Sequence, residues 1–156
     1  MTKTNLFSVI GTAKYAKVFP RNKDNNEDYH GPGGAYTIDL LMEKEELDKF
    51  TKSGSRLKPN LTEDGVSVKF KRKHNPPTRK NGSPIEEFGG PPRVVDHENK
   101  PWDDTVSIGN GSVVEVWFTV YDTRKGKGTR LEGIRVIEHV PYETDGEYES
   151  GVRLPF

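Results

Sequence analysis

The sequence contains no cysteine and no long apolar run. Without cysteine there is no disulfide framework, no thiol nucleophile and no cysteine-based zinc site. No stretch approaches the ~18 apolar residues of a membrane span, and the first five residues are polar, unlike a signal peptide. We therefore expect an unprocessed, soluble protein that makes no contact with a membrane.

Alanine and leucine are also scarce, with 3 and 8 residues, whereas valine and isoleucine together number 20. Branched side chains favour strands, while alanine and leucine favour helices, so the composition predicts a mostly β protein. The 156 residues fit one domain, and 24 basic residues balance 24 acidic ones. Because the net charge is zero, charge repulsion does not favour disorder, and we expect a compact domain over 1–142 with a mobile tail over 143–156.

Hydrophobic patterning predicts five or six strands and one short helix. Residues 6–19 read as a long bent strand with a bulge at Gly11, and 43–52 read as a helix that closes one end of a sheet. Further strands are expected at 35–42, 65–73, 93–96, 113–121 and 130–140, the last two forming a hairpin. A small closed or nearly closed antiparallel barrel with long loops accounts for these elements, because closure removes exposed edges. A β-sandwich is the alternative.

Charge is distributed unevenly along the chain. Residues 68–93 contain seven basic and two acidic residues, whereas 143–156 contain four acidic residues and one arginine. This asymmetry indicates a site for a polyanion and a tail able to mimic one. A solvated strand beside a solubilising tail is the plainer interpretation.

Aromatic residues lie on the predicted outer faces of two strands, in the first of them beside Lys17. Inward placement of Val116, Phe118 and Val120 leaves Trp117 and Tyr121 outside. Rings interleaved with Lys and Arg suit single-stranded nucleic acid, since bases stack on rings and cations follow phosphates. The rings could instead pack under loops or in a dimer interface. The residues selected on this basis are Tyr15, Lys17, Lys69, Lys71, Arg72, Lys73, Trp117, Tyr121 and the hairpin-tip cations Arg124, Lys125, Lys127 and Arg130.

No catalytic constellation is visible. The four histidines are scattered, and the acids at 96–98 and 103–104 lie in turn-rich segments. We therefore expect no enzyme activity, no metal and no cofactor. Two other functions stay open: a structural virion or assembly protein, whose outer aromatics form a subunit interface, and a metal-dependent nuclease that uses these acids.

Several short motifs occur in a characteristic order. They are "GTAKYAKVF", a glycine- and proline-rich loop with "GPGGAYTIDLLM", "VSVKFKRK", "VVD", "IGNGSVVEVWFTVY" and "GTRLEGIRVIEHV". Their order and spacing over residues 1–140 resemble the single-stranded-DNA-binding proteins of T-seven-like podophages, the gene 2.5 type.

This resemblance implies a five-stranded OB-fold barrel with a capping helix, in a viral homodimer of the host cytoplasm. Such a protein coats single-stranded DNA without sequence preference during replication, recombination and repair. Lys3, Lys69 and Lys71 match basic positions of the family, and Tyr121 lies near an aromatic position used for DNA. The resemblance also implies an acidic tail that contacts the phage DNA polymerase and helicase-primase and competes with DNA. The tail residues concerned are Glu143, Asp145, Glu147, Glu149 and the terminal Phe156.

Overall fold

The computed structural model describes residues 5–141, in which seven strands form one sheet. The strands are β1 (Asn5–Lys17), β2 (Ala35–Leu41), β3 (Asn60–Thr62), β4 (Gly65–Lys73), β5 (Arg93–Val95), β6 (Val113–Thr123) and β7 (Gly126–Glu138). The helices are α1 (Glu27–His30) and α2 (Lys44–Lys52), with 3-10 turns η1 (Pro20–Asn22) and η2 (Glu86–Phe88). The mostly β prediction is confirmed.

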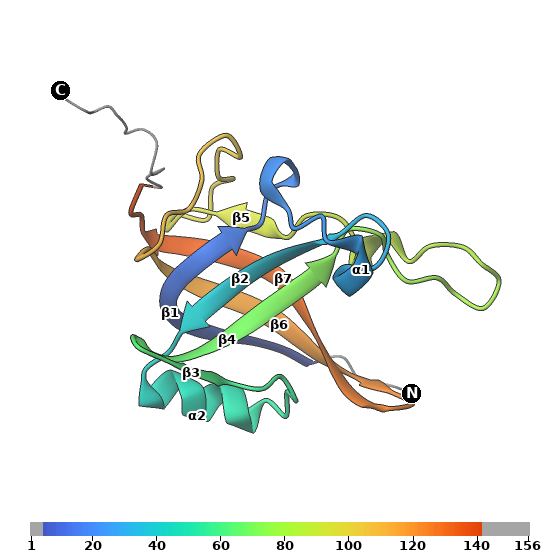
Figure 1. Cartoon of the computed structure of the whole chain (residues 1–156), viewed down its shortest axis with the longest axis horizontal. Helices are drawn as coiled ribbons and strands as arrows, with labels where there is room; N and C mark the ends of the chain where they lie inside the picture. The colour runs from blue at the N-terminus through green and yellow to red at the C-terminus, as the bar shows by residue number, and fades with distance from the viewer. Residues whose placement is uncertain (1–4, 142–156) are drawn as a thin grey trace.

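The strand order is β3-β4-β2-β1-β6-β7-β5, and every neighbouring pair is antiparallel except β5 with β7. The sheet curls, so that β2 and β4 lie in front of β6 and β7 in Figure 1. The prediction of a five-stranded barrel is wrong, because the sheet has seven strands and is open. No ladder of backbone hydrogen bonds joins β4 to β7. The side chain of Arg72 connects them instead, since its Nη1 donates to the Leu131 carbonyl over 3.2 Å.

The hydrophobic core fills the inside of the curl. Val68 and Phe70 of β4 are fully buried and the intervening Lys69 is exposed, as expected for a strand with one face in the core. Helix α2 closes one end, because Phe50 packs edge-on against Phe70 at 5.9 Å between ring centroids and also contacts Phe118 at 5.9 Å. The predicted short helix and its capping position are both confirmed.

Strand β1 bends at a different residue from the one expected. The register with β2 shifts between Lys14 and Lys17, where Tyr15 adopts a φ of 51°. Gly11 instead lies in regular pairing with Val114. A Cβ atom there would lie 2.2 Å from the Leu41 carbonyl oxygen, so Gly11 allows β1 and β2 to approach closely.

Two elements have no counterpart in the hydrophobic pattern. Strand β3 consists of three exposed residues, with Leu61 85% exposed, so it carries no alternation between core and solvent. Helix α1 is a single turn inside a segment of turn-forming residues, and the Asn26 side chain accepts the backbone N–H of Tyr29 at its start. Both elements are held by local backbone pairing rather than by burial of apolar residues.

Two extensions flank one end of the sheet. The predicted hairpin is confirmed, although its turn is tighter than expected, since β6 and β7 are joined directly after Thr123 and before Gly126. The segment over 75–92 is one of the expected long loops, and it projects from the right-hand side of the molecule in Figure 1. Within residues 5–141, no helix is long and apolar enough to cross a bilayer.

Candidate functional site

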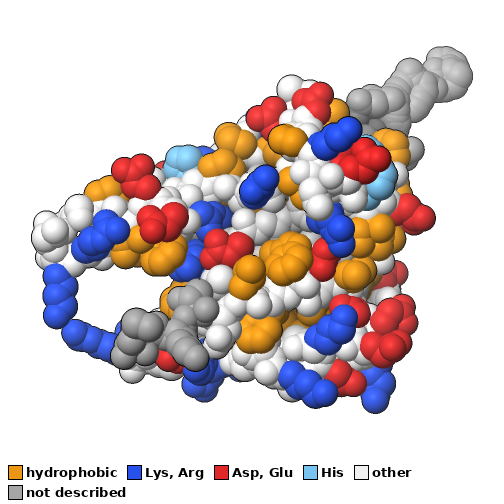
Figure 2. Space-filling view, turned by 180° about the vertical axis from the view of Figure 1, so that it is seen from behind, with side chains coloured by type: hydrophobic (Ala, Val, Ile, Leu, Met, Phe, Trp, Pro, Cys, Tyr) orange, Lys and Arg blue, Asp and Glu red, His pale blue; other side chains and the backbone are white. Residues whose placement is uncertain are grey.

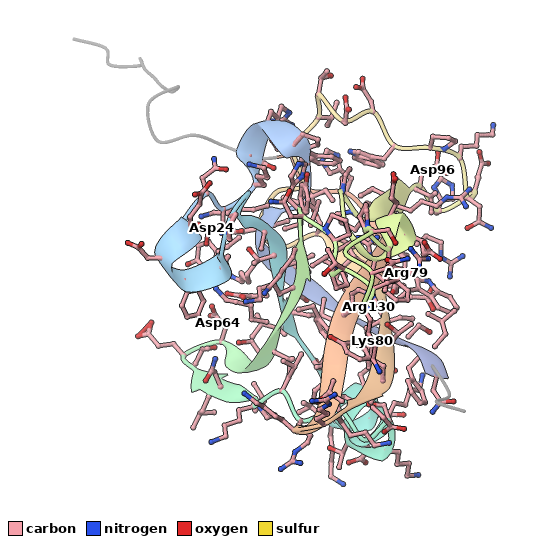
Figure 3. All side chains as sticks on the ribbon, turned by 90° about the vertical axis from the view of Figure 1, so that its right-hand side faces the viewer. Asp24, Asp64, Arg79, Lys80, Asp96 and Arg130 are labelled. Atoms are coloured by element: carbon pink, nitrogen blue, oxygen red, sulfur yellow. The ribbon has the colours of Figure 1, made fainter. Side chains whose placement is uncertain are left out.

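A cleft of about 410 Å³ lies between the loop over 75–92, the end of β4, helix α1 and the β6–β7 hairpin. Five of the residues predicted from the sequence line it: Lys71, Arg72, Lys73, Tyr121 and Arg130. In Figure 3 the loop comes toward the viewer, carrying Arg79 and Lys80 in front of Arg130. The cleft therefore unites cations and a ring that lie up to 59 residues apart in the chain.

Arg72 also lines the cleft, but its guanidinium is committed to the protein. The residue is 6% exposed, and its N–H groups donate to the backbone carbonyls of Glu87, Gly89 and Gly90 in the loop at 2.7–2.9 Å. It also pairs with the Glu132 carboxylate on β7 over 3.1 Å. Arg72 thus holds the loop against β4 and β7, and we leave it out of the proposed contact set.

Arg130 lies between two aromatic rings. Its Cζ is 3.8 Å from the ring centroid of Phe88 and 4.9 Å from that of Tyr121, and its Nε donates to Glu132 over 2.7 Å. Arg130 is only 9% exposed, so its guanidinium mainly contacts the two rings and holds them in place rather than facing solvent. Phe88 was not predicted from the sequence. It lies in a loop without hydrophobic periodicity, and its contact with Arg130 forms only in the folded protein.

Tyr121 remains partly exposed at the cleft, where a base could stack. The partner strand makes room for its ring: a Cβ atom at Gly128 would lie 2.6 Å from the ring carbons. The ring is therefore supported by Arg130 on one side and seated over a glycine on the neighbouring strand.

A second basic surface continues from the cleft over the outer face of β1, β2 and β4. Thr37 pairs with Lys17 on one side and with Lys71 on the other, so these lysines flank β2 in one cross-strand row. Lys69 lies in the next row, 3.7 Å from the Asp39 carboxylate. The ring of Tyr29 on α1 is 73% exposed and lies 5.2 Å from Lys71 Nζ, a contact that sequence reasoning missed.

Other predicted residues lie outside the cleft. Tyr15 is 66% exposed in a separate depression beside Asp64. Trp117, 37% exposed, lines a third depression with Leu6 and Val95. Trp117 and Tyr121 therefore do not form one stacking surface, although they face outward from the same strand.

The hairpin-tip cations Arg124, Lys125 and Lys127 are exposed, and Lys127 pairs with Asp122. Figure 2 shows Lys and Arg side chains at the left-hand end of the molecule, around the opening between the loop over 75–92 and the hairpin. Lys3 and the tail residues Glu143, Asp145, Glu147, Glu149 and Phe156 lie outside the described residues.

The acidic residues at 96–98 and 103–104 lie in turns, which Asp96 and Asp103 stabilise by hydrogen bonds. The Asp96 carboxylate accepts the backbone N–H groups of Lys100 and Glu98, and these bonds lower its pKa. The Asp103 carboxylate accepts the hydroxyl and the N–H of Thr105, which lower its pKa in the same way. Among the residues that the structure describes, no three His, Asp or Glu side chains converge as metal ligands. Nothing in these geometries favours the nuclease alternative.

The fold is that of single-stranded-DNA-binding proteins from bacteriophages. One similar structure is gp2.5, a single-stranded-DNA-binding protein encoded by bacteriophage T7, with a TM-score of 0.63 and 19% identity over 99% of both chains. Another is the single-stranded-DNA-binding protein from bacteriophage Enc34 in complex with single-stranded DNA, with a TM-score of 0.58 and 14% identity over 88% of this chain and 89% of that one. These structures confirm, at the level of the fold, the resemblance indicated by the sequence motifs. No protein-family model and no curated protein matches the sequence.

The role of Arg72 can be tested with Arg72→Lys. A single ammonium cannot satisfy three loop carbonyls, Leu131 and Glu132 together, so we expect unfolding in urea to show a loss of about 2–4 kcal/mol. Limited proteolysis should then cut the loop over 75–92 at least ten times faster. Lys73→Ala, at the next residue along β4 and on its exposed face, is the control and should leave the cleavage rate unchanged. Equal cleavage of wild type and Arg72→Lys would show that the loop does not depend on this side chain.

Proposed function

We propose that this protein binds single-stranded DNA without sequence preference and coats it during phage DNA replication, recombination and repair. The observation that carries the proposal is the cleft in which the partly exposed ring of Tyr121 lies with Lys71 and Lys73. Stacking on a ring accepts any base, and lysines recognise phosphates rather than base edges. The fold shared with phage single-stranded-DNA-binding proteins supports the same conclusion.

In this proposal each part of the cleft has a separate role. Lys71 and Lys73 neutralise phosphates, and one base stacks on Tyr121, whose ring lies against Arg130, which in turn contacts Phe88. Lys17 and Lys69 extend the path of the strand over the outer face, and the exposed cations Arg124 and Lys125 of the hairpin tip contact it from the other side. Coating requires binding alone, so we propose no catalytic step in this function.

The assembly-protein alternative has one observation in its favour. Trp117 lines an apolar depression with Leu6, which is 57% exposed, and such a patch suits contact with another protein. A subunit interface at this patch is compatible with a DNA-binding cleft elsewhere. The homodimer implied by the sequence resemblance stays a prediction.

A titration of fluorescently labelled oligo-dT at two salt concentrations tests the proposed function. We expect tight binding that weakens with salt by a slope of about −0.7 per neutralised phosphate, because each contact releases counterions. Unlabelled duplex DNA should compete poorly, since paired bases cannot stack on Tyr121. Failure to bind at low salt, together with large oligomers insensitive to salt, would favour the assembly protein.

Substitution of the two outward rings of β6 locates the site. Tyr121→Ala should weaken binding to every sequence by about 1–3 kcal/mol, because a stacking surface is lost. Tyr121→Phe keeps the ring and should restore most of the affinity, which the same anisotropy assay measures. Trp117→Ala, on the same strand but outside the cleft, should have a smaller effect. A larger loss for Trp117→Ala than for Tyr121→Ala would move the site to the other depression.

We also propose that the acidic tail binds the phage DNA polymerase and helicase-primase and competes with DNA for the basic cleft. The support is its charge, with four acidic residues and one arginine over 143–156. A chain ending at residue 143 should bind oligo-dT more tightly at low salt and should no longer stimulate the polymerase in a primer-extension assay. Unchanged or weaker DNA binding would exclude the competition.

A further inference from the structure

Asp24, His30 and Lys71 form a chain of hydrogen bonds in the wall of the cleft. His30, at the end of α1, is 3% exposed; its Nε2 lies 2.9 Å from Asp24 Oδ2 and its Nδ1 lies 3.3 Å from Lys71 Nζ. The backbone of Asp24 is fixed by two hydrogen bonds with Ala35 at 2.9 Å, and Lys71 is carried by β4. Figure 3 shows Asp24 beside α1. Three separate segments therefore position this chain.

The bonding partners define which nitrogen of His30 carries the proton. The hydrogen bond from His30 and the N–H of Asn26 hold the pKa of Asp24 below its usual value, so its carboxylate is ionised and accepts from Nε2–H. With Nε2–H donating to Asp24, Nδ1 is left as the acceptor that faces Lys71 Nζ. His30 is thus a base oriented by a carboxylate and in contact with an amine.

Lys71 differs from the other lysines of this face in its contact with a histidine, His30. Lys14 and Lys69 instead pair with carboxylates, those of Asp64 at 3.4 Å and Asp39 at 3.7 Å. Burial lowers the pKa of Lys71, and the charges of Lys73 and Lys69 lower it further, against a smaller opposing effect of Asp24. Partial desolvation and neighbouring cations are the means by which proteins make a lysine nucleophilic.

The nucleophile, the base and the group that orients the base are therefore all present, and the nucleophile faces the cleft. The proposed function brings a deoxyribose backbone to the same place. The electrophile that single-stranded DNA offers to an amine is the C1′ aldehyde of an abasic site in its ring-opened form. An abasic sugar also lacks the base that would otherwise occupy space beside Lys71.

We propose that Lys71 forms an imine with the C1′ aldehyde of abasic sites in single-stranded DNA bound in the cleft. This inference rests on the proposed DNA-binding function and adds a covalent capture site to it. The occupant is a nucleic-acid aldehyde rather than a free sugar or an aldehyde cofactor, because the surrounding lysines select a phosphate backbone.

The step balances without any further reactant. Lys71 ammonium gives one proton to His30 Nδ1, and the freed lone pair forms a bond to C1′ while the carbonyl π electrons move to oxygen. The oxygen then leaves as water, taking the proton held on His30 and a second proton from the nitrogen. The products are a protonated imine on Lys71 and one water molecule, with the charge of +1 unchanged. Asp24 stabilises the transient imidazolium and keeps its orientation.

Reductive trapping tests this proposal. A labelled single-stranded oligonucleotide with one abasic site is incubated with the full chain and cyanoborohydride, and the products are separated on a denaturing gel. We expect a covalent adduct with the abasic strand and none with the same strand carrying a tetrahydrofuran analogue, which has no aldehyde. Mass spectrometry of the digested adduct should identify Lys71 as the modified residue.

Variants are compared at protein concentrations that saturate each with DNA, as measured by anisotropy on the tetrahydrofuran strand. Lys71→Arg keeps the charge but cannot form an imine, and it should lower the adduct yield at least tenfold. Lys14→Arg, on the same face and paired with Asp64, is the matched control and should keep the full yield. Asp24→Asn should slow adduct formation at least threefold.

The outcomes separate this inference from the proposed function. Saturable binding of the strand with no adduct, or with an adduct that persists in Lys71→Arg, would overturn the imine site and leave DNA binding intact. Modification spread over many lysines in the digested adduct would overturn it as well. Absence of binding to either strand would overturn both proposals.

Discussion

The guanidinium of Arg72 joins the parts of the molecule on which the cleft depends. The curled sheet has no ladder between β4 and β7, and the loop over 75–92 has no extended pairing with the sheet. One planar cation with five N–H groups connects all three, because its donors point in several directions from a fixed plane. Burying this charge is costly, and the cost is offset by the number of carbonyl and carboxylate oxygens that surround it.

This connection also fixes the positions of the aromatic residues in the cleft. Phe88 lies at the end of η2, next to the carbonyls that Arg72 holds, and the Phe88 ring covers Arg130. Glu132 accepts from both arginines and so couples the loop anchor to the support of Tyr121. These contacts are made within the chain itself, and a site that is preformed in this way reduces the entropy lost when a flexible strand binds.

The sequence predicted elements best where burial sets the pattern. Residues 65–73 were correctly predicted as a strand, and the structure places Arg72 on the inner side with Val68 and Phe70. Its positive charge nevertheless suggested a phosphate contact, because the loop carbonyls that bind it come from residues with no periodicity. Elements without a buried face, such as β3 and α1, left no hydrophobic signal and were missed.

The surroundings of the two outward rings could not be predicted, because they depend on the register between β6 and β7. Outward orientation of Trp117 and Tyr121 was correct, but the ladder between β6 and β7 shifts between Trp117 and Phe118. The two rings also border different neighbours, the first near β5 and the second near the loop over 75–92. A single sequence shows neither the shift nor these neighbours, so it grouped the two rings together.

Gly128 in the basic hairpin is required for a reason other than flexibility. The ring of Tyr121 occupies the volume that a side chain at Gly128 would fill. The position of the Tyr121 ring, which we propose contacts DNA, thus depends on the absence of a side chain at Gly128 on the neighbouring strand. A side chain at Gly128 would therefore displace the Tyr121 ring, and a ring at another position of the hairpin would need its own vacant position opposite.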